Sequence, residues 1–168
     1  MNITAGKFKG QKVTAPDETI TRPTLSKVRM AVFNTLQALI DFEGASFLDL
    51  FAGSGIMGLE ALSRGFERVV AIEKNPKVYN ILLNNYKALK VKPNVLKGDS
   101  LKVIPQEHFD VIYIDPPYYS GVYEKSLEVL PDCNIVILEH TTDVDFGKYE
   151  VIKQKKYGDK TLTYLRKL

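Results

Sequence analysis

The chain of 168 residues has a single cysteine, Cys133, and only two histidines. One cysteine cannot form a disulfide within the chain, and no cluster of cysteines and histidines has the spacing of a structural zinc site. The sequence therefore predicts no metal site. It also predicts a fold that is held together by the packing of its hydrophobic core alone.

Long hydrophobic runs are equally scarce. The longest, such as those at 69–72 and 135–138, have four residues, whereas a membrane-spanning helix needs about 20. Residues 1–10 are rich in lysine and glycine and lack the apolar core of a signal peptide. We expect a cytoplasmic protein without a membrane segment. A length of 168 residues with 45% hydrophobic side chains is typical of one globular domain.

Positive charge is unevenly distributed along the chain, whose net charge is +3. Residues 1–30 hold six basic side chains against two acidic ones, and residues 148–168 hold seven against two, so that the middle of the chain carries −6. Basic ends around an acidic centre are typical of a protein that holds a polyanion at the edges of its site. The alternative is that these lysines are simply solvated.

From residue 46 onward, short apolar segments alternate with helical patterns, which is typical of an α/β fold with a parallel sheet. The predicted parallel strands are at 46–51, 68–73, 94–97, 109–115 and 134–139. The predicted helices are at 55–63, 76–90 and, with a weaker pattern, 123–130. Strand-like runs at 149–157 and 161–165 flank the turn pair Gly158-Asp159, which predicts a final antiparallel hairpin.

Two further elements precede the sheet. Apolar residues recur at steps of three and four over 24–40, with Pro23 and Thr24 at the start, which predicts one helix. The opening stretch has turn residues such as Gly6 and Gly10 and little room for core. We expect it to be a short extended arm or hairpin.

The first predicted strand leads straight into a glycine-rich turn. Gly53, Gly55 and Gly58 have G-x-G-x-x-G spacing between a strand and a helix. Glycines permit a tight turn there, and the free N–H groups of the helix attract a carboxylate or a phosphate. Glu73 ends the next strand about 20 residues later, where an acid can accept both ribose hydroxyls of a nucleoside. The pattern predicts a cofactor that contains adenosine.

This pattern fits both a nicotinamide dinucleotide and S-adenosyl-L-methionine. Asp49, four residues before the first glycine, favours the second because it can reach a cationic amino-acid group, although it can also serve as a cap or turn acceptor. Asp99 either accepts the adenine amino group or caps the helix that follows, and these roles are compatible. The remaining predicted cofactor contacts are Phe51, Ser54, Lys74 and Ser100.

The fourth strand ends in Asp115-Pro116-Pro117-Tyr118. Two prolines lock the backbone and remove two N–H donors, which leaves carbonyls to point into the site. Asp115 and a proline carbonyl then form a pair of acceptors for the two hydrogens of an exocyclic amine, and Asp115 can take the displaced proton. Tyr118 offers a flat face for an unstacked base. The alternative is a rigid turn followed by a core aromatic.

The Asp-Pro-Pro-Tyr tetrapeptide resembles the signature of amino methyltransferases that act on adenine N6, guanine N2 or glutamine amides. More narrowly, the sequence resembles the bacterial family of small-subunit ribosomal RNA guanine-N2 methyltransferases. The resemblance extends from the N-terminal arm to Tyr118, and beyond Tyr119 it rests on length and pattern. The stretches that carry it are Gly6-Lys7-Phe8-Lys9-Gly10, Arg22-Pro23-Thr24, Val28-Arg29, Phe33-Asn34, 49–55 and 58–65.

The resemblance implies a Rossmann-like class I methyltransferase fold, with a mostly parallel seven-stranded sheet in a catalytic core at 24–168 and an RNA-binding arm at 1–23. It implies S-adenosyl-L-methionine as cofactor and a guanine of 16S ribosomal RNA as substrate, presented in the small ribosomal subunit or an assembly intermediate. The residues implied around the cofactor are Asp49, Gly53, Ser54, Gly55, Glu73 and Asp99. The residues implied to hold the amine are Asp115, Pro116, Pro117 and Tyr118. The residues implied to contact RNA phosphates are Lys7, Lys9, Lys12, Arg22 and Arg29, although Arg29 can equally pair with a nearby acid.

Several alternatives fit the same residues. Adenine-N6 methylation of DNA and glutamine methylation of a protein would use the same acceptor pair. A nicotinamide-dependent oxidoreductase would share the glycine turn and Glu73, but it leaves the two prolines unexplained. A non-enzymatic RNA-binding module would have little use for a nucleoside pocket and an acceptor pair. We expect a monomer.

Overall fold

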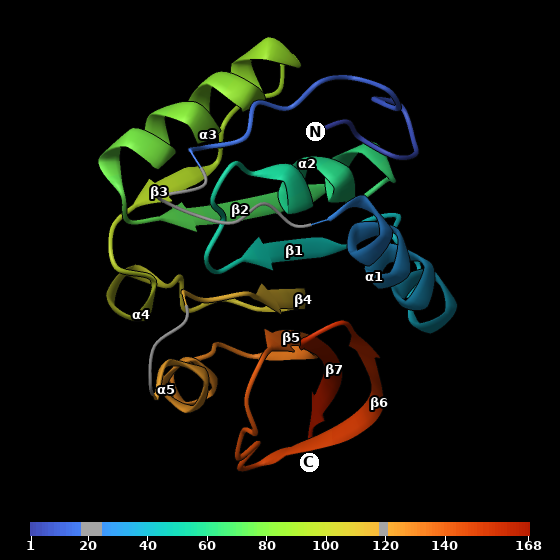
Figure 1. Ribbon diagram of the computed structural model, residues 1–168, viewed down its shortest axis with the longest axis vertical. Helices are drawn as coiled ribbons and strands as arrows, with labels where there is room; N and C mark the ends of the chain where they lie inside the picture. Colours follow the sequence, from blue (N-terminus) through green and yellow to red (C-terminus); the bar gives the residue numbers. More distant parts are fainter. Residues whose placement is uncertain (18–24, 118–120) are drawn as a thin grey trace.

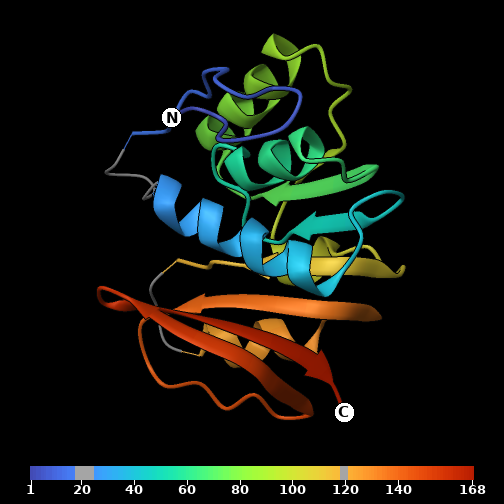
Figure 2. The same cartoon turned by 90° about the vertical axis from the view of Figure 1, so that its right-hand side faces the viewer.

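The computed structural model describes residues 1–17, 25–117 and 121–168, and its strands form one sheet with helices on both faces (Figure 1, Figure 2). The strands are β1 (Ser46–Asp49), β2 (Arg68–Glu73), β3 (Val95–Lys97), β4 (Phe109–Ile114), β5 (Cys133–His140), β6 (Tyr149–Tyr157) and β7 (Lys160–Lys167). The helices are α1 (Ser26–Leu39), α2 (Ile56–Ser63), α3 (Pro76–Ala88), α4 (Ser100–Val103) and α5 (Val122–Glu128). Within the described residues, no helix is long and apolar enough to cross a membrane.

The sheet has seven strands in the order β3-β2-β1-β4-β5-β7-β6. β1 to β5 pair in parallel, whereas β7 is antiparallel to β5 and to β6. This arrangement confirms the predicted mostly parallel sheet and its final antiparallel hairpin. The strand order reverses between β1 and β4, and open α/β sheets bind their ligands outside the carboxyl ends of the strands at such a switch point.

The predicted strands and helices are present, and they differ from the predictions mainly at their ends. β1 ends at Asp49 rather than at residue 51, because the chain already turns at Leu50. α5 begins and ends earlier than the predicted 123–130. The predicted start of the first helix at residue 24 lies outside the described residues. Strand and helix positions could therefore be predicted to within a few residues.

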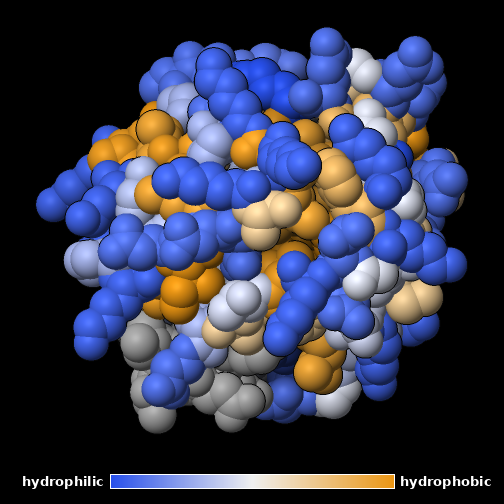
Figure 3. Space-filling model, turned by 90° about the horizontal axis from the view of Figure 1, so that it is seen from above, coloured by the Kyte–Doolittle hydropathy of each residue, from blue (hydrophilic) through white to orange (hydrophobic). Residues whose placement is uncertain are grey.

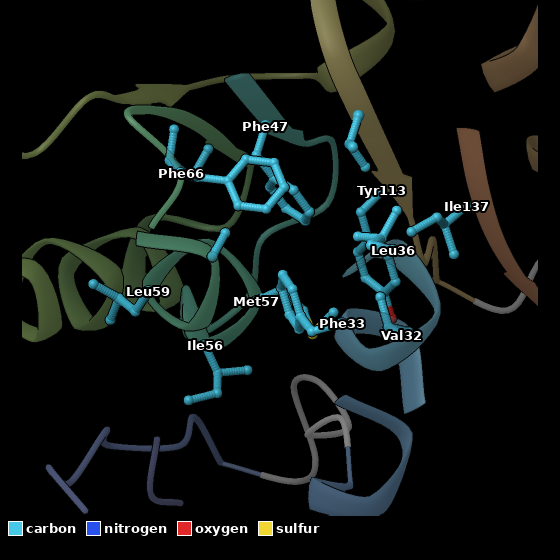
Figure 4. Close-up of a cluster of buried hydrophobic side chains, with 14 of the residues drawn as sticks. Val32, Phe33, Leu36, Phe47, Ile56, Met57, Leu59, Phe66, Tyr113 and Ile137 are labelled. Carbon is cyan, nitrogen blue, oxygen red and sulfur yellow. The ribbon is translucent and has the colours of Figure 1, made fainter. Parts of the chain in front are cut away.

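Hydrophobic side chains cover both faces of the sheet. On the face under α1 and α2, the ring of Phe33 stacks on Phe47 with 5.9 Å between centroids, and Phe66 contacts both rings edge-on (Figure 4). On the opposite face, side chains of α5 such as Leu127 pack in one buried cluster with Ile112 and other strand residues. Because both of their faces are buried, the central strands such as β2 and β4 are nearly continuous hydrophobic runs.

The N-terminal arm folds back on itself, as the hairpin alternative of the prediction expects, and it adds two residues to the core. Ile3 and Val13 are buried, and an antiparallel bridge between Asn2 and Lys12 closes the arm into a loop. The burial of these two residues could not be predicted from the sequence, because only two core residues flank a run of lysine and glycine.

Seen from above, the molecular surface is largely hydrophilic, with smaller hydrophobic areas between the charged side chains (Figure 3).

A buried carboxylate on α2 holds this arm in place. Glu60 accepts the backbone N–H of Thr4 at 3.0 Å and that of Ala5 at 3.2 Å. It also forms an ion pair with Arg64, with 3.0 Å between Oε2 and Nε. Near the end of α2, a Cβ at Gly6 would lie 1.8 Å from the carbonyl oxygen of the last helical residue, so the arm and the helix are in backbone contact.

Candidate active site

The glycine turn connects the end of β1 to the first turn of α2. Gly53 and Gly55 have φ angles of +57° and +87°, a left-handed conformation that residues with side chains disfavour. At Gly55 a Cβ would also lie 2.3 Å from Cδ1 of Leu82, and at Gly58 a Cβ would lie 2.7 Å from the hydroxyl oxygen of Tyr86. The glycines therefore allow both a tight turn and the close packing of α2, as their spacing predicts.

Glu73, the last residue of β2, fastens this turn. Its Oε1 accepts the backbone N–H of Gly53 at 2.9 Å, and its Oε2 accepts that of Asn75 at 2.8 Å. Each carboxylate oxygen has two lone pairs, so both retain an acceptor position for a ribose hydroxyl. Lys74 is exposed beside it. The carboxylate is therefore held in a fixed position by the backbone of the protein itself.

Asp49, at the end of β1, is buried without a side-chain partner among the described residues, and the backbone N–H of Phe51 lies close to its carboxyl group. It is 1% exposed, and neither of its carboxyl oxygens has a hydrogen bond with the described residues. Burial, and then the nearby charge of Glu73, raise the pKa of Asp49 to about 8. Such a group is costly unless it is paired, which is typical of a site that a ligand completes. A cationic amino group would supply the missing partner, and the half-buried Phe51 lies two residues further along.

Three other predicted cofactor residues are already bonded to the backbone. The side chains of Ser54 and Asp99 each accept the N–H two residues further along, at 3.2 Å and 3.0 Å. For Asp99 this is the N-cap of α4, so the predicted capping role is confirmed. The buried Ser100 donates its hydroxyl to the carbonyl of Leu50. Its hydroxyl proton is thus engaged in joining the loop after β3 to the end of β1.

The structure brings the two predicted acids to one edge of the sheet. Asp49 lies opposite Tyr113 in the pairing of β1 with β4, and Asp115 follows two residues later on the same face. Pro116 is buried and Pro117 is exposed. Tyr118 lies outside the described residues. The end of β1 and the start of the proline segment are therefore adjacent at the switch point of the sheet.

Asp115 lies among titratable groups that the sequence prediction did not include. The buried Glu139 of β5 accepts hydrogen bonds from the hydroxyl of Tyr113 and, at 2.5 Å, from the ammonium of Lys160. Burial, and then Glu139, raise the pKa of Asp115 well above its usual range, while Lys160 acts in the opposite direction. Two close carboxyls favour one shared proton. One feature of the sequence could have identified Glu139: it is an acid at the carboxyl end of a predicted strand.

The two ends of the arm lie at different distances from this edge: Thr14, two residues after Lys12, is hydrogen-bonded to Asn85, which also donates to the carbonyl of Ser54 in the glycine turn, whereas Lys7 lies far from it. Lys7 donates its backbone N–H to the carbonyl of Ser63 at 2.9 Å. Ser63 is the last of the eight residues of α2, so it lies about 12 Å along the helix from the glycine turn. Lys9 and Lys12 are exposed in the same loop. Arg22 lies outside the described residues.

The prediction that Arg29 contacts RNA phosphates is wrong. Arg29 is 1% exposed on α1. Its Nη2 donates to the carbonyl of Asn2 at 2.7 Å, and its Nε lies 3.6 Å from Oε1 of Glu60. The alternative that it pairs with a nearby acid is confirmed, and its charge is used inside the protein to hold the arm against α1 and α2.

Comparison with known proteins places this arrangement in a family. The family model described as "Conserved hypothetical protein 95" matches residues 1–166. Ribosomal RNA small subunit methyltransferase D of Escherichia coli (strain K12) is 34% identical over 135 residues, which cover 79% of this chain and 67% of the relative. The protein of the same name from Haemophilus influenzae is 34% identical over 141 residues, which cover 80% and 72%. The chain belongs to the family that this model describes, together with these ribosomal RNA small subunit methyltransferases.

A solved structure extends the similarity to the whole fold. A hypothetical protein of Thermus thermophilus superimposes with a TM-score of 0.83 at 27% identity, over 99% of each chain. Family and fold together identify a methyltransferase with a Rossmann-like class I fold, which confirms the resemblance seen in the sequence. The oxidoreductase and the non-enzymatic RNA-binding module are therefore set aside.

Proposed function

We propose that this methyltransferase transfers a methyl group from S-adenosyl-L-methionine to the N2 amine of a guanine in 16S ribosomal RNA. The observation that carries the proposal is the pair of acids at the ends of β1 and β4. Asp49 is buried without a side-chain partner among the described residues, beside a glycine turn, which suits a cationic amino acid. Asp115 precedes two prolines, which suits an amine. The names of the Escherichia coli and Haemophilus influenzae relatives support RNA as the substrate.

The residues of the cofactor side fit S-adenosyl-L-methionine. Asp49 would pair with its amino group, Glu73 would accept its ribose hydroxyls, and Asp99 would accept its adenine amino group with the oxygen that does not cap α4. The left-handed turn at Gly53 and Gly55 would present backbone N–H groups to the cofactor. The remaining residues proposed to line this side are Phe51, Ser54, Lys74 and Ser100. When bound, the cofactor supplies an electrophilic methyl group.

The target-amine side holds the nucleophile and accepts its proton. Asp115 and the carbonyl of Pro116 would each accept one N–H of the guanine amine, which turns the nitrogen lone pair toward the methyl carbon. Asp115 would take the proton that the nitrogen loses when it accepts the methyl group that the cofactor supplies. Glu139 would share this proton, and Lys160 would offset the remaining negative charge. On the sequence alone, Pro117 and Tyr118 would support and stack on the base.

The finer features of the substrate are part of the same proposal. We infer that 16S ribosomal RNA is bound in the small ribosomal subunit or in an assembly intermediate, by a monomer of this protein in the cytoplasm. Lys7, Lys9 and Lys12 would contact RNA phosphates, and on the sequence alone Arg22 would do the same. DNA adenine and protein glutamine would present the same two N–H donors to Asp115, so the experiment that tests the proposal must separate these three substrates.

That experiment offers methyl-labelled S-adenosyl-L-methionine with three acceptors in parallel: small ribosomal subunits that lack the modification, double-stranded DNA, and a mixture of ribosomal proteins. We expect label in 16S ribosomal RNA only, and none with Asp115→Asn. Label in DNA or protein would refute RNA as the substrate. No label in any acceptor, with correctly folded protein, would contradict the proposal as a whole.

A further inference from the structure

The β6–β7 hairpin ends in a group of basic side chains beside the candidate active site. This basic tip consists of Lys155, Lys156, Tyr157 and Lys160, and its turn is at Gly158. Because β7 is antiparallel to β5, its first residues lie beside the last residues of β5. The tip of the hairpin accordingly extends beyond the arrowhead of β5 (Figure 2). The basic tip thus lies at the same edge of the sheet as the carboxyl ends of β1 and β4.

A row of paired residues connects the basic tip to the target-amine side. Glu139 lies opposite Leu162, and Leu162 lies opposite Lys155. The register of β4 with β5, extended by one residue beyond its last pair, places Asp115 opposite Glu139. Paired residues share a face, and adjacent strands are about 4.8 Å apart. Lys155 is therefore three strands from Asp115, on the order of 14 Å between Cα atoms.

Within the basic tip, the charges of Lys155 and Lys156 are available to a ligand, whereas Lys160 is bonded to Glu139. Lys155 and Lys156 are exposed, and neither forms an ion pair with the described residues. The ammonium of Lys155 lies 5.2 Å from the ring centroid of Tyr157, which is partly buried. Residues 155–160 have three basic side chains against Asp159. Cations next to an aromatic ring are typical of surfaces that bind the backbone of a nucleic acid.

The location of the basic tip contrasts with that of Lys7 in the arm. The backbone of Lys7 is bonded to the far end of α2, whereas Lys160 is bonded at 2.5 Å to Glu139, the neighbour of Asp115. A guanine amine at Asp115 therefore brings its flanking phosphates nearer to the hairpin than to Lys7.

We propose that the basic tip binds the phosphate backbone of the substrate RNA within a few nucleotides of the target guanine. The inference rests on the proposed function, because the partner is the RNA that carries this guanine. Lys155 and Lys156 form the phosphate contacts, and Lys160 remains bonded to Glu139 inside the site. Lys7 of the arm contacts RNA further away, so it contributes less to holding the nucleotides next to the guanine.

A matched control exists on the same hairpin. Lys148 and Lys167 are exposed at the opposite end, where Lys167 pairs with Tyr149, eight residues along β6 from Tyr157. This separation is about 27 Å. The double variant K155E/K156E and the control K148E/K167E thus introduce the same change of charge at opposite ends of one hairpin. Thermal unfolding of both proteins verifies that they fold, and K155Q/K156Q replaces the tip variant if the reversed charges prevent folding.

The experiment measures binding to small ribosomal subunits that lack the modification, over a series of salt concentrations. For the tip variant we expect affinity to fall roughly tenfold or more, and the slope of log K against log salt to flatten by about two, one for each lost phosphate contact. We expect the control to retain wild-type affinity and slope. Equal binding by the two variants, whether weakened or unchanged, would overturn the inference.

Methyl transfer by the wild-type protein separates this inference from the function on which it rests. If the wild-type protein labels 16S ribosomal RNA and the two variants bind equally, only the role of the basic tip is refuted. If the wild-type protein labels DNA or protein instead, the proposed function is refuted, and an RNA-binding tip with it.

Discussion

Glu73 on the cofactor side and Asp115 on the target-amine side both lie at the carboxyl end of a parallel strand, yet different groups surround them. Both oxygens of Glu73 accept backbone N–H groups, from Gly53 and Asn75. Asp115 instead lies beside the side chains of Glu139 and Lys160, which come from two other strands. The first carboxylate is held by backbone geometry, whereas the state of the second depends on neighbouring charges.

This difference corresponds to two different tasks. A cofactor-binding acid needs a fixed position, which backbone donors provide. A proton acceptor needs a tuned pKa, which burial and neighbouring charges provide. Asp49 is the exception on the cofactor side, because it is buried and has no side-chain partner among the described residues until a ligand binds. The comparison makes separate predictions for the two sides.

The largest effect is expected from Asp115→Asn. The amide cannot take the amine proton, so we expect the single-turnover rate of methyl transfer to fall about 10²- to 10⁴-fold, with cofactor affinity nearly unchanged. Rapid-quench measurement of labelled RNA and calorimetric titration of the cofactor verify the two parts. The exposed Asp132→Asn is the control. A comparable loss of cofactor affinity would contradict the separation of the two sides.

Asp49→Asn is expected to weaken cofactor binding and to stabilise the ligand-free protein. Loss of the charged partner should weaken affinity about 10- to 100-fold. The pKa of Asp49 is raised to about 8 in the folded chain, so the unfolded chain ionises first as pH rises and the wild type loses stability between about pH 4 and 8. In urea unfolding, the free energy of unfolding of Asp49→Asn should therefore exceed that of the wild type. The difference should be small at pH 4 and reach up to about 4 kcal/mol near neutral pH. A gain that does not depend on pH would contradict this account of Asp49.

Glu139→Gln and Lys160→Met should move the pH dependence of methyl transfer in opposite directions. Glu139 raises the pKa of Asp115 and Lys160 lowers it. If Asp115 acts as the ionised acceptor, the acid limb of the profile moves to lower pH in Glu139→Gln and to higher pH in Lys160→Met. Rates at saturating cofactor over a pH series provide the measurement. Shifts in the same direction would show that charge coupling does not govern Asp115.

The smallest effect on methyl transfer is expected at the arm, where two glycines offer a matched pair. Gly6 and Gly10 both have a φ of +84°, but only at Gly6 would a Cβ collide with Ser63. Gly10→Ala should lower the free energy of unfolding by about 1 kcal/mol, because alanine disfavours a positive φ. Gly6→Ala should lower it by about 1–3 kcal/mol more, because its Cβ also collides with the helix. Urea denaturation compares them. Equal stability would mean that backbone contact does not hold the arm.

The cofactor side could be predicted from the sequence because its parts are local. The strand, the glycines at fixed spacing and the acid at the end of the next strand follow one another within 25 residues, 49–73. The buried contacts of the arm could not be predicted in this way. Glu60 is distant in sequence from Thr4, and nothing in the local pattern of α2 distinguishes a carboxylate that faces solvent from one that binds another segment.

The target-amine side was predicted only in part, for the same reason. Asp115 was identified from the tetrapeptide that contains it, but Glu139 and Lys160 come from β5 and β7 and meet Asp115 only through the strand order. Arg29 shows the opposite error, because a basic residue near a basic arm suggested RNA although its partner is buried. Local motifs identify the chemistry, and tertiary pairing decides which charges remain available.

The position of the methyl group in the product tests the central claim most directly. After reaction with small ribosomal subunits, 16S ribosomal RNA is digested to nucleosides, and these are separated by chromatography and identified by mass spectrometry. An acceptor pair at Asp115 and Pro116 predicts a methylated exocyclic amine, since only such an amine offers two hydrogens to it, and the proposed substrate makes the product N2-methylguanosine. A methyl group on a ring nitrogen or on the ribose would contradict the account.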